Sequence, residues 1–218
     1  MATNPDGVQQ KVATFFANYP RQQFAKRQII IQAGEQPVYV FYLLDGRVSQ
    51  YDISSTGSEV VVNVFKPPAF FSMAWAINRS PNQYFFEAAT DVVVRQAPPD
   101  DVVAFLHQEP DVLFDLLSRV YRGTDGILRR IAHLIGGDAK SRLVFEIINS
   151  ARRFGIADGG AVSIPLKEGD LARHSGMARE TVSRVVQGLK KDGLIQVTKV
   201  GLLVLDLRKL EDELGSGL

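Results

Sequence analysis

A seven-residue repeat of apolar side chains in the middle of the chain constrains the fold more than any other feature. The steps between its positions alternate between four and three residues, and one slot is filled by threonine: Leu113, Leu117, Val120, Thr124, Ile127, Ile131 and Leu134. This spacing is typical of a helix whose apolar seam packs against a second helix of the same kind. We therefore expect one long helix over residues 111–135 and a homodimer held by this seam. The alternative is an amphipathic helix that packs only on its own domain.

The middle and the end of this helix indicate how the chain is divided. A second apolar stripe, made of Leu116, Leu128 and Ile135, is expected to pack back on the residues that precede the helix. Two glycines, Gly123 and Gly126, weaken the middle of the helix, each by about 1 kcal/mol relative to Ala. The sequence Gly-Gly-Asp at 136–138 ends the helix and can cap the next one. We therefore expect two domains, residues 1–137 and residues 138–218.

The residues before the long helix have the pattern of a β-rich domain. A short N-terminal helix is followed by apolar runs separated by turn-forming residues: IIIQAG, VYVFYLLDG, RVSQYDIS, EVVVNVF, YFFEAAT and VVVRQA. Asp45-Gly46 and Thr56-Gly57 supply the positive-φ positions that tight turns need. Several short strands at this spacing predict a sandwich, a barrel or a roll. The sequence Pro-Pro-Asp at 98–100 then begins a further helix.

Residues 138–218 have the pattern of a helical domain with a β-hairpin. A helix over 139–153 is followed by a turn and a short strand in ADGGAVSIPL. Two helices, Lys167 to His174 and Arg179 to Lys191, are joined by Ser-Gly-Met-Ala, and LIQVTKVGLLVLDL predicts a hairpin before a closing helix over 208–214. Two helices with a Gly-bearing turn of this length, followed by a hairpin, predict a winged helix-turn-helix. Such a unit places its second helix in the major groove of DNA.

The second helix of this motif has one apolar face and one polar face. Its outer face carries Arg179, Glu180, Ser183, Arg184 and Gln187. An arginine can form a bidentate contact with guanine, and a glutamate can accept a hydrogen bond from cytosine. Phosphate contacts are expected from three nearby lysines, Lys190, Lys191 and Lys199. The alternative is that Glu180 and Arg184 form an ordinary surface pair, worth a few tenths of a kcal/mol. Residues 167–199 carry seven Lys or Arg against four Asp or Glu, a local excess that favours DNA.

Composition excludes several other classes of protein. The chain has no cysteine, which removes disulfides, thiolate metal sites and cysteine nucleophiles. Its three histidines, His107, His133 and His174, are too far apart to suggest metal ligands. There is no Gly-rich phosphate loop, no signal-peptide core and no apolar run of membrane-spanning length. We expect a cytoplasmic protein that is not an enzyme, binds no cofactor and has no membrane contact.

The order of elements and the segment DLARHSGMARETVSRVVQGLKKDGLI at 170–195 resemble the CRP/FNR family of bacterial transcription regulators. The resemblance covers nearly the whole chain and is strongest over 138–196, at Gly34-Glu35 and from Leu43 to Val48. It implies an α+β fold: an N-terminal double-stranded β-helix of the jelly-roll, cyclic-nucleotide-binding type as the effector domain, the long dimerisation helix, and the winged helix. It also implies double-stranded DNA and RNA polymerase as partners.

The recognition helix matches the cyclic-AMP-receptor branch of this family, whose Arg-Glu-Thr-Val-x-Arg stands here at 179–184. By that similarity Arg179, Glu180 and Arg184 read the bases of a palindrome with TGTGA-like half-sites. Thr181 and Ser183 lie among these residues and complete the expected DNA-binding set. Lys167 is expected to touch phosphate at the start of the first helix of the motif.

The effector site of the cyclic-AMP-binding members does not carry over. Their Gly-Glu-Leu segment and Arg-Ser pair, which hold ribose and phosphate, are matched here by Phe-Ser-Met-Ala at 71–74 and by Asn82-Gln83. Their adenine-reading Thr-Ser pair is replaced by Ile127-Leu128, and Arg79 is near enough in sequence to substitute for the phosphate arginine. The candidate pocket is therefore Phe71, Ser72, Arg79, Asn82, Gln83, Ile127 and Leu128. The aromatic residues of this region form either core or the lining of a pocket for a small molecule less polar than a nucleotide.

The sequence is compatible with two functions from different classes. The first is a homodimeric, sequence-specific transcription regulator whose effector is unknown and is not cyclic AMP. The second is a cyclic-nucleotide-binding module that acts on a protein partner. The missing phosphate-binding residues and the positively charged winged helix favour the first. The oxygen-sensing branch of the family needs N-terminal cysteines, and the haem-bound members need a His or Cys ligand in the β-roll, so neither chemistry is expected here.

Overall fold

The computed structural model describes residues 5–215, which form two compact units. The first unit comprises the residues up to Ile53 together with Val61–Gly123, and the second comprises Ser54–Val60 and the residues from Thr124 onward. Helix α4 (Pro110–Gly136) contributes to both units, so the division falls inside this helix. The long helix predicted over 111–135 is thereby confirmed, whereas the domain boundary expected after residue 137 stays a prediction.

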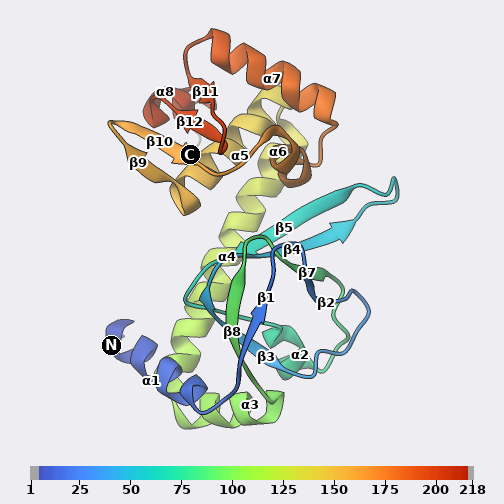
Figure 1. Cartoon of the computed structure of the whole chain (residues 1–218), viewed down its shortest axis with the longest axis vertical. Helices are drawn as coiled ribbons and strands as arrows, with labels where there is room; N and C mark the ends of the chain where they lie inside the picture. Colours follow the sequence, from blue (N-terminus) through green and yellow to red (C-terminus); the bar gives the residue numbers. More distant parts are fainter. Residues whose placement is uncertain (1–4, 216–218) are drawn as a thin grey trace. The chain divides into compact units, whose positions relative to one another are not determined.

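Two four-stranded sheets form the β part of the chain (Figure 1). One sheet has the order β1 (Arg21–Phe24), β8 (Val92–Ala97), β3 (Val40–Asp45) and β6 (Ala69–Phe71). The other has the order β2 (Ile29–Ile31), β7 (Phe85–Ala88), β4 (Val48–Ile53) and β5 (Glu59–Phe65). The pairs β1–β8, β3–β8, β3–β6, β2–β7 and β4–β7 are antiparallel. Phe41 and Leu43 from the first sheet share one buried core with Phe86 and Ala88 from the second. This arrangement confirms the predicted β-roll.

The apolar runs of the sequence predict six of these eight strands, and the remaining two show what periodicity misses. Strand β1 reads Arg-Gln-Gln-Phe and buries only Phe24, so it has no apolar run to detect. Strand β6 is three residues long, and the short helix α2 (Met73–Asn78) follows it. The predicted tight turns are confirmed, because Gly46 has φ +85° and Gly57 has φ +78°.

Helices α1 (Pro5–Ala17) and α3 (Pro99–Gln108), with the start of α4, cover a second core in the first unit. Its buried side chains include Phe16 of α1, Tyr42 of β3 and Val112 of α4. Lys11 of α1 donates to the carboxylates of Glu109 and Asp111, each at 2.7 Å, which fixes α1 against the α3–α4 connection.

The expectation for the second stripe of α4 is wrong for two of its three residues. Leu116 packs on the core of the first unit, but Leu128 is 58% exposed and Ile135 is 79% exposed. Both lie beyond Gly123, in the part of α4 that belongs to the second unit. The buried core of that unit is built from the residues after α4, and neither side chain is part of it.

The second unit is a helical domain with a small antiparallel sheet of order β11-β12-β10-β9. Its elements are α5 (Ala139–Phe154), β9 (Ile156–Asp158), β10 (Ala161–Ile164), α6 (Glu168–Ser175), α7 (Arg179–Lys191), β11 (Ile195–Val197), β12 (Leu202–Val204) and α8 (Leu207–Asp212). The Asp138 carboxylate accepts a hydrogen bond from the Ser141 N–H at 2.7 Å, so the predicted cap of α5 is confirmed. The predicted winged helix-turn-helix is confirmed. Strand β9 was not predicted, because its three residues are all exposed.

Candidate DNA-binding surface

Local sequence fixes the turn between α6 and α7. At the start of α6 the Asp170 carboxylate accepts a hydrogen bond from the Lys167 N–H at 3.0 Å. At its end the Ser175 hydroxyl donates to the Leu171 carbonyl at 2.7 Å, and Gly176 adopts φ +64°. A left-handed residue after a helix is readily supplied by glycine, because other residues are strained there by their Cβ atom. The turn therefore directs the chain from α6 into α7.

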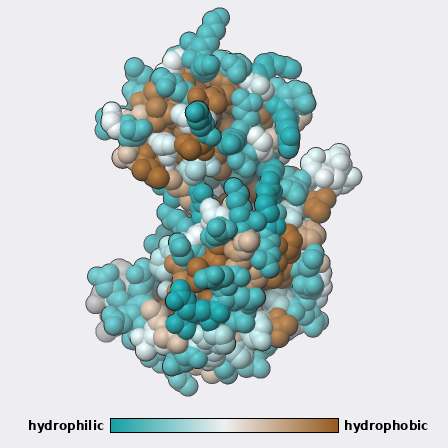
Figure 2. All heavy atoms as spheres, viewed as in Figure 1, coloured by the Kyte–Doolittle hydropathy of each residue, from teal (hydrophilic) through white to brown (hydrophobic). Residues whose placement is uncertain are grey.

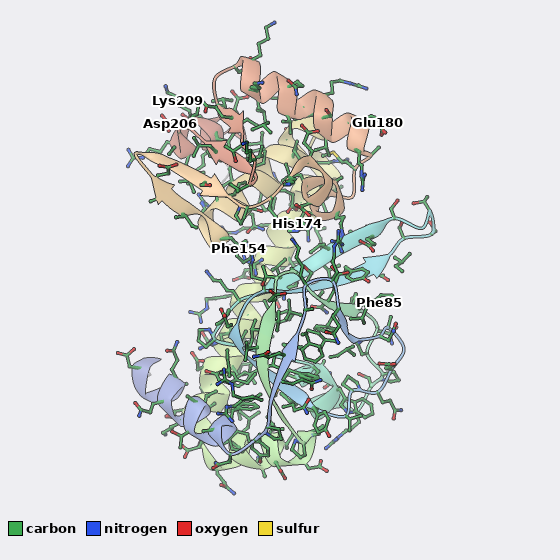
Figure 3. The ribbon with its side chains drawn as sticks, viewed as in Figure 1. Phe85, Phe154, His174, Glu180, Asp206 and Lys209 are labelled. Carbon is green, nitrogen blue, oxygen red and sulfur yellow. The ribbon has the colours of Figure 1, made fainter. Side chains whose placement is uncertain are left out.

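Helix α7 buries one face completely and exposes the other. Val182, Val186 and Leu189 are each 0% exposed and belong to the core of the second unit. The predicted base-reading residues Arg179, Glu180 and Arg184 are exposed, while Thr181 and Ser183 are partly buried beside them. Figure 3 places Glu180 at the N-terminal end of α7, and Figure 2 shows the edge of the unit along α7 as largely hydrophilic. The outer face of α7 therefore presents the chemistry that base edges require.

Glu180 and Arg184 are separated by four residues on α7, the spacing of an ordinary surface pair. Within the part of the chain that the structure describes, no ion pair joins Glu180 to Arg184. Both side chains lie on the solvent side of the helix with their charged ends free of each other. This arrangement favours an external partner over a pair that stabilises the helix.

The predicted phosphate-contacting lysines are all exposed in the second unit. Lys167 precedes α6, Lys190 and Lys191 occupy the last turn of α7, and Lys199 lies in the turn of the β11–β12 hairpin. That turn is fixed by the Thr198 hydroxyl, which accepts from the Gly201 N–H at 3.1 Å. A Cβ atom on Gly201 would lie 2.1 Å from the Ile164 carbonyl oxygen, so the hairpin packs closely on the end of β10. The wing is therefore held rigidly by its own unit.

Phe71, the first residue of the predicted effector pocket, lies in the buried core between the two sheets. Phe71 is 1% exposed, and its ring lies 4.9 Å from the ring of Phe41 and 5.5 Å from that of Phe86, measured between centroids. The Phe65 ring, 5.8 Å from that of Phe71, completes an aromatic cluster between the two sheets. Phe41 and Phe65 lie in the predicted strands, where the sequence does not distinguish them from other core residues. Aromatic side chains thus form part of the core between the two sheets.

Polar residues of the same region bond to their own loops. The Ser72 hydroxyl donates to the Tyr39 carbonyl at 2.6 Å. The Asn82 amide donates to the carbonyls of Gln32 and Tyr84, and the exposed Gln83 amide donates to the Pro81 carbonyl at 3.2 Å. These side chains therefore stabilise the connections between strands.

Arg79, Ile127 and Leu128 are the remaining residues of the candidate pocket. The Arg79 guanidinium pairs with the carboxylate of Asp100 at the start of α3. Ile127 and Leu128 lie in the part of α4 that belongs to the second unit, with 52% and 58% of their surface exposed. No single unit contains all the candidate pocket residues.

None of the helices within residues 5–215 is long and apolar enough to span a membrane. No group of three or more His, Cys, Asp or Glu side chains in this range is arranged to hold a metal ion.

Comparison with known protein families gives a match for each part of the chain. The Cyclic nucleotide-binding domain matches residues 21–109, and the Crp-like helix-turn-helix domain matches residues 141–213. A cyclic-nucleotide-binding β-roll followed by a Crp-like helix-turn-helix domain defines a class of DNA-binding transcription regulators.

Curated relatives and solved structures agree with this class. The chain is 28% identical over 191 residues to a Global nitrogen regulator of Synechocystis sp., with 84% of this chain and 83% of the relative aligned. Its fold is similar to that of the c-di-GMP Responsive Global Regulator CLP of Xanthomonas campestris, with a TM-score of 0.79, 17% identity, and 91% and 98% of the two chains covered. It is also similar to a CRP/FNR-family transcriptional regulator of Thermus thermophilus, with a TM-score of 0.76, 24% identity, and 90% and 99% covered. The chain belongs to the CRP/FNR family of transcription regulators.

Proposed function

We propose that this protein is a homodimeric transcription regulator that reads a palindromic, TGTGA-like DNA site with the outer face of α7. The observation that carries the proposal is the division of α7 into a fully buried apolar face and a free polar face. Arg179 and Arg184 supply donors for guanine, and Glu180 supplies an acceptor for the cytosine amino group. Lys167, Lys190, Lys191 and Lys199 supply the surrounding phosphate contacts.

The homodimer is supported by the exposure of the heptad seam. Leu113, Leu117, Val120, Ile127 and Ile131 are between 40% and 56% exposed. A row of large apolar residues on one helix face marks a protein–protein interface, because single chains in water rarely leave such a surface uncovered. The seven-residue repeat makes a second copy of α4 the matching partner.

We also propose that cyclic AMP is not held here in the family's usual manner. A cyclic phosphate inside the roll needs a paired cation, because a buried unpaired charge is costly. By the resemblance to the cyclic-AMP-binding members, Asn82 replaces that cation, and its amide donates to the Gln32 carbonyl. Phe71 belongs to the buried core between the two sheets. The effector is therefore either a less polar small molecule or absent.

Partners other than DNA follow from the family alone. The resemblance supports RNA polymerase as a partner, since these proteins regulate transcription. The competing proposal, a cyclic-nucleotide-binding module acting on a protein partner, is disfavoured because it leaves the free polar face of α7 without a role.

Selection of bound sequences from random DNA tests the proposed function. A two-fold dimer requires an inverted repeat with half-site centres about one helical turn apart, roughly 34 Å. We expect the selected sequences to contain such a repeat with guanines and a cytosine-bearing pair in each half. Recovery of no inverted repeat would overturn the proposal, as would retention on DNA that does not depend on salt.

A further inference from the structure

A buried ion pair ties the last part of α4 to the winged helix. Glu146 lies on the inner side of α5 and is only 1% exposed. Its carboxylate accepts a hydrogen bond from Arg130 Nε at 2.5 Å, and the Arg130 side chain is itself 16% exposed. Arg130 lies on α4 beyond Gly123, so both partners belong to the second unit.

The same guanidinium makes a second contact at the start of the helix-turn-helix turn. Its Nη2 donates to the main-chain carbonyl of His174, which is in the last turn of α6. The positive-φ Gly176 and the first residue of α7, Arg179, follow within five residues. Figure 3 labels His174 in this position between α6 and α4. A planar guanidinium presents several donors in a rigid fork, so one side chain fixes α4, α5 and α6 relative to one another.

Apolar packing between α4 and the helices that follow it is limited. The core of the second unit, as described, draws its buried residues from α5 to α8 and the small sheet, with none from α4. One ring contact joins α4 to α5, with the His133 and Phe145 rings stacked 4.4 Å apart. Arg130 therefore supplies a directional link between the end of α4 and the helix-turn-helix.

A buried ion pair is weak evidence of a role in stability. Removing two charges from water costs about as much as their attraction returns, and apolar replacements of similar volume are often as stable. Burial raises the pKa of Glu146, and Arg130 and Arg153 oppose this shift. Beyond apolar packing, the pair supplies direction, because the hydrogen bonds of a planar guanidinium depend on the angle at which its partners approach.

We infer that Arg130 is a positioning residue that sets the distance between the two recognition helices of the dimer. The inference rests on the proposed function, since it requires a dimer that reads two half-sites. Because α4 is fixed in the dimer and Arg130 fixes α6 to α4, the two α7 helices are held at one distance from each other. The protein is therefore selective for the spacing between half-sites as well as for their sequence.

The test uses the full-length protein and inverted repeats whose central spacer is shortened or lengthened by one or two base pairs. The double variant Arg130→Met, Glu146→Leu removes the directional link and keeps an apolar contact. Arg129→Met is the matched control, because Arg129 is the neighbouring exposed arginine of α4. We expect the wild type and the control to prefer one spacer by about tenfold or more. We expect the double variant to lose most of this preference, to within about threefold, with an unchanged melting temperature.

The outcomes separate the inference from the function beneath it. A double variant that folds and keeps the spacer preference of the wild type overturns the role of Arg130. If that variant does not fold, Arg130→Lys decides in the same assay, because an ammonium retains the charge but cannot bridge two acceptors as a guanidinium does. A flattened preference supports the inference, and an unchanged one overturns it. Failure of the wild type to prefer any inverted repeat contradicts the proposed function itself.

Discussion

Charges placed in the α4 seam should separate the proposed dimer. The perturbation is Leu117→Lys with Ile131→Lys, two positions of the heptad that are each 44% exposed in the single chain. Full burial of such a side chain is worth about 1.5–3 kcal/mol, so covering the remaining half contributes about 1 kcal/mol per residue. Four side chains change in each dimer, which amounts to about 4 kcal/mol, or roughly a thousandfold in the dissociation constant. The desolvation of four lysines adds to this loss.

Sedimentation velocity over a range of protein concentrations measures this effect. The matched control is Ser118→Lys with Ala132→Lys, which adds the same charges at the adjacent exposed positions of the same helix. We expect the control to sediment as a dimer and the seam variant as a monomer at micromolar concentration. A seam variant that remains a dimer refutes the interface and places dimerisation on another surface.

Three further predictions concern other parts of the chain. Calorimetry with cyclic AMP or cyclic GMP should show no binding. Micromolar binding of either would contradict this prediction and make Arg79 the candidate phosphate ligand. Burial, with a smaller contribution from Arg130, lowers the pKa of His174 from 6.5 to about 4, so the folded protein resists its protonation. The stability that depends on neutral His174 is present above pH 6.5 and is lost as the pH falls toward 4, by up to about 3 kcal/mol. His174→Gln should make the denaturation midpoint less dependent on pH over this range. If the pH dependence of the midpoint is unchanged in this variant, another group causes the acid sensitivity. Asp138→Ala should lower the free energy of unfolding by about 1 kcal/mol through loss of the α5 cap, and Asp138→Ser should restore most of it if capping is the cause.

Local periodicity was sufficient to predict most of the fold. The heptad from Leu113 to Leu134 predicted α4, and alternating apolar runs predicted the longer strands. These patterns work because each element buries one face, and the period of burial is written into the sequence. Strand β1 escaped because only Phe24 of its four residues is buried. The placement of Leu128 and Ile135 was wrong because periodicity shows that a face is apolar but not what covers it.

The proposed DNA-reading face of α7 was easier to predict from the sequence than the contacts between distant residues of the chain. Arg179, Glu180 and Arg184 lie on one helix, so their common face follows from local spacing. Arg130 and Glu146 are sixteen residues apart on different helices, and each looks like an ordinary surface charge in a sequence. The hydrogen bond from the Asn82 amide to the Gln32 carbonyl could not be predicted either, because the two residues are far apart in the sequence. Contacts of this kind depend on the tertiary arrangement and become visible only with it.

The most direct test of the central claim is the affinity of Arg184→Ala and Lys191→Ala for a panel of sites, each changed at one base pair. If α7 reads bases, Arg184→Ala should cost about 1–3 kcal/mol on the best site and lose discrimination at a single base-pair position of each half-site. Lys191→Ala should weaken binding to every sequence alike and reduce the salt slope by about one unit. An Arg184→Ala protein whose affinity falls equally for every sequence would contradict base reading by α7 and reduce Arg184 to a phosphate contact.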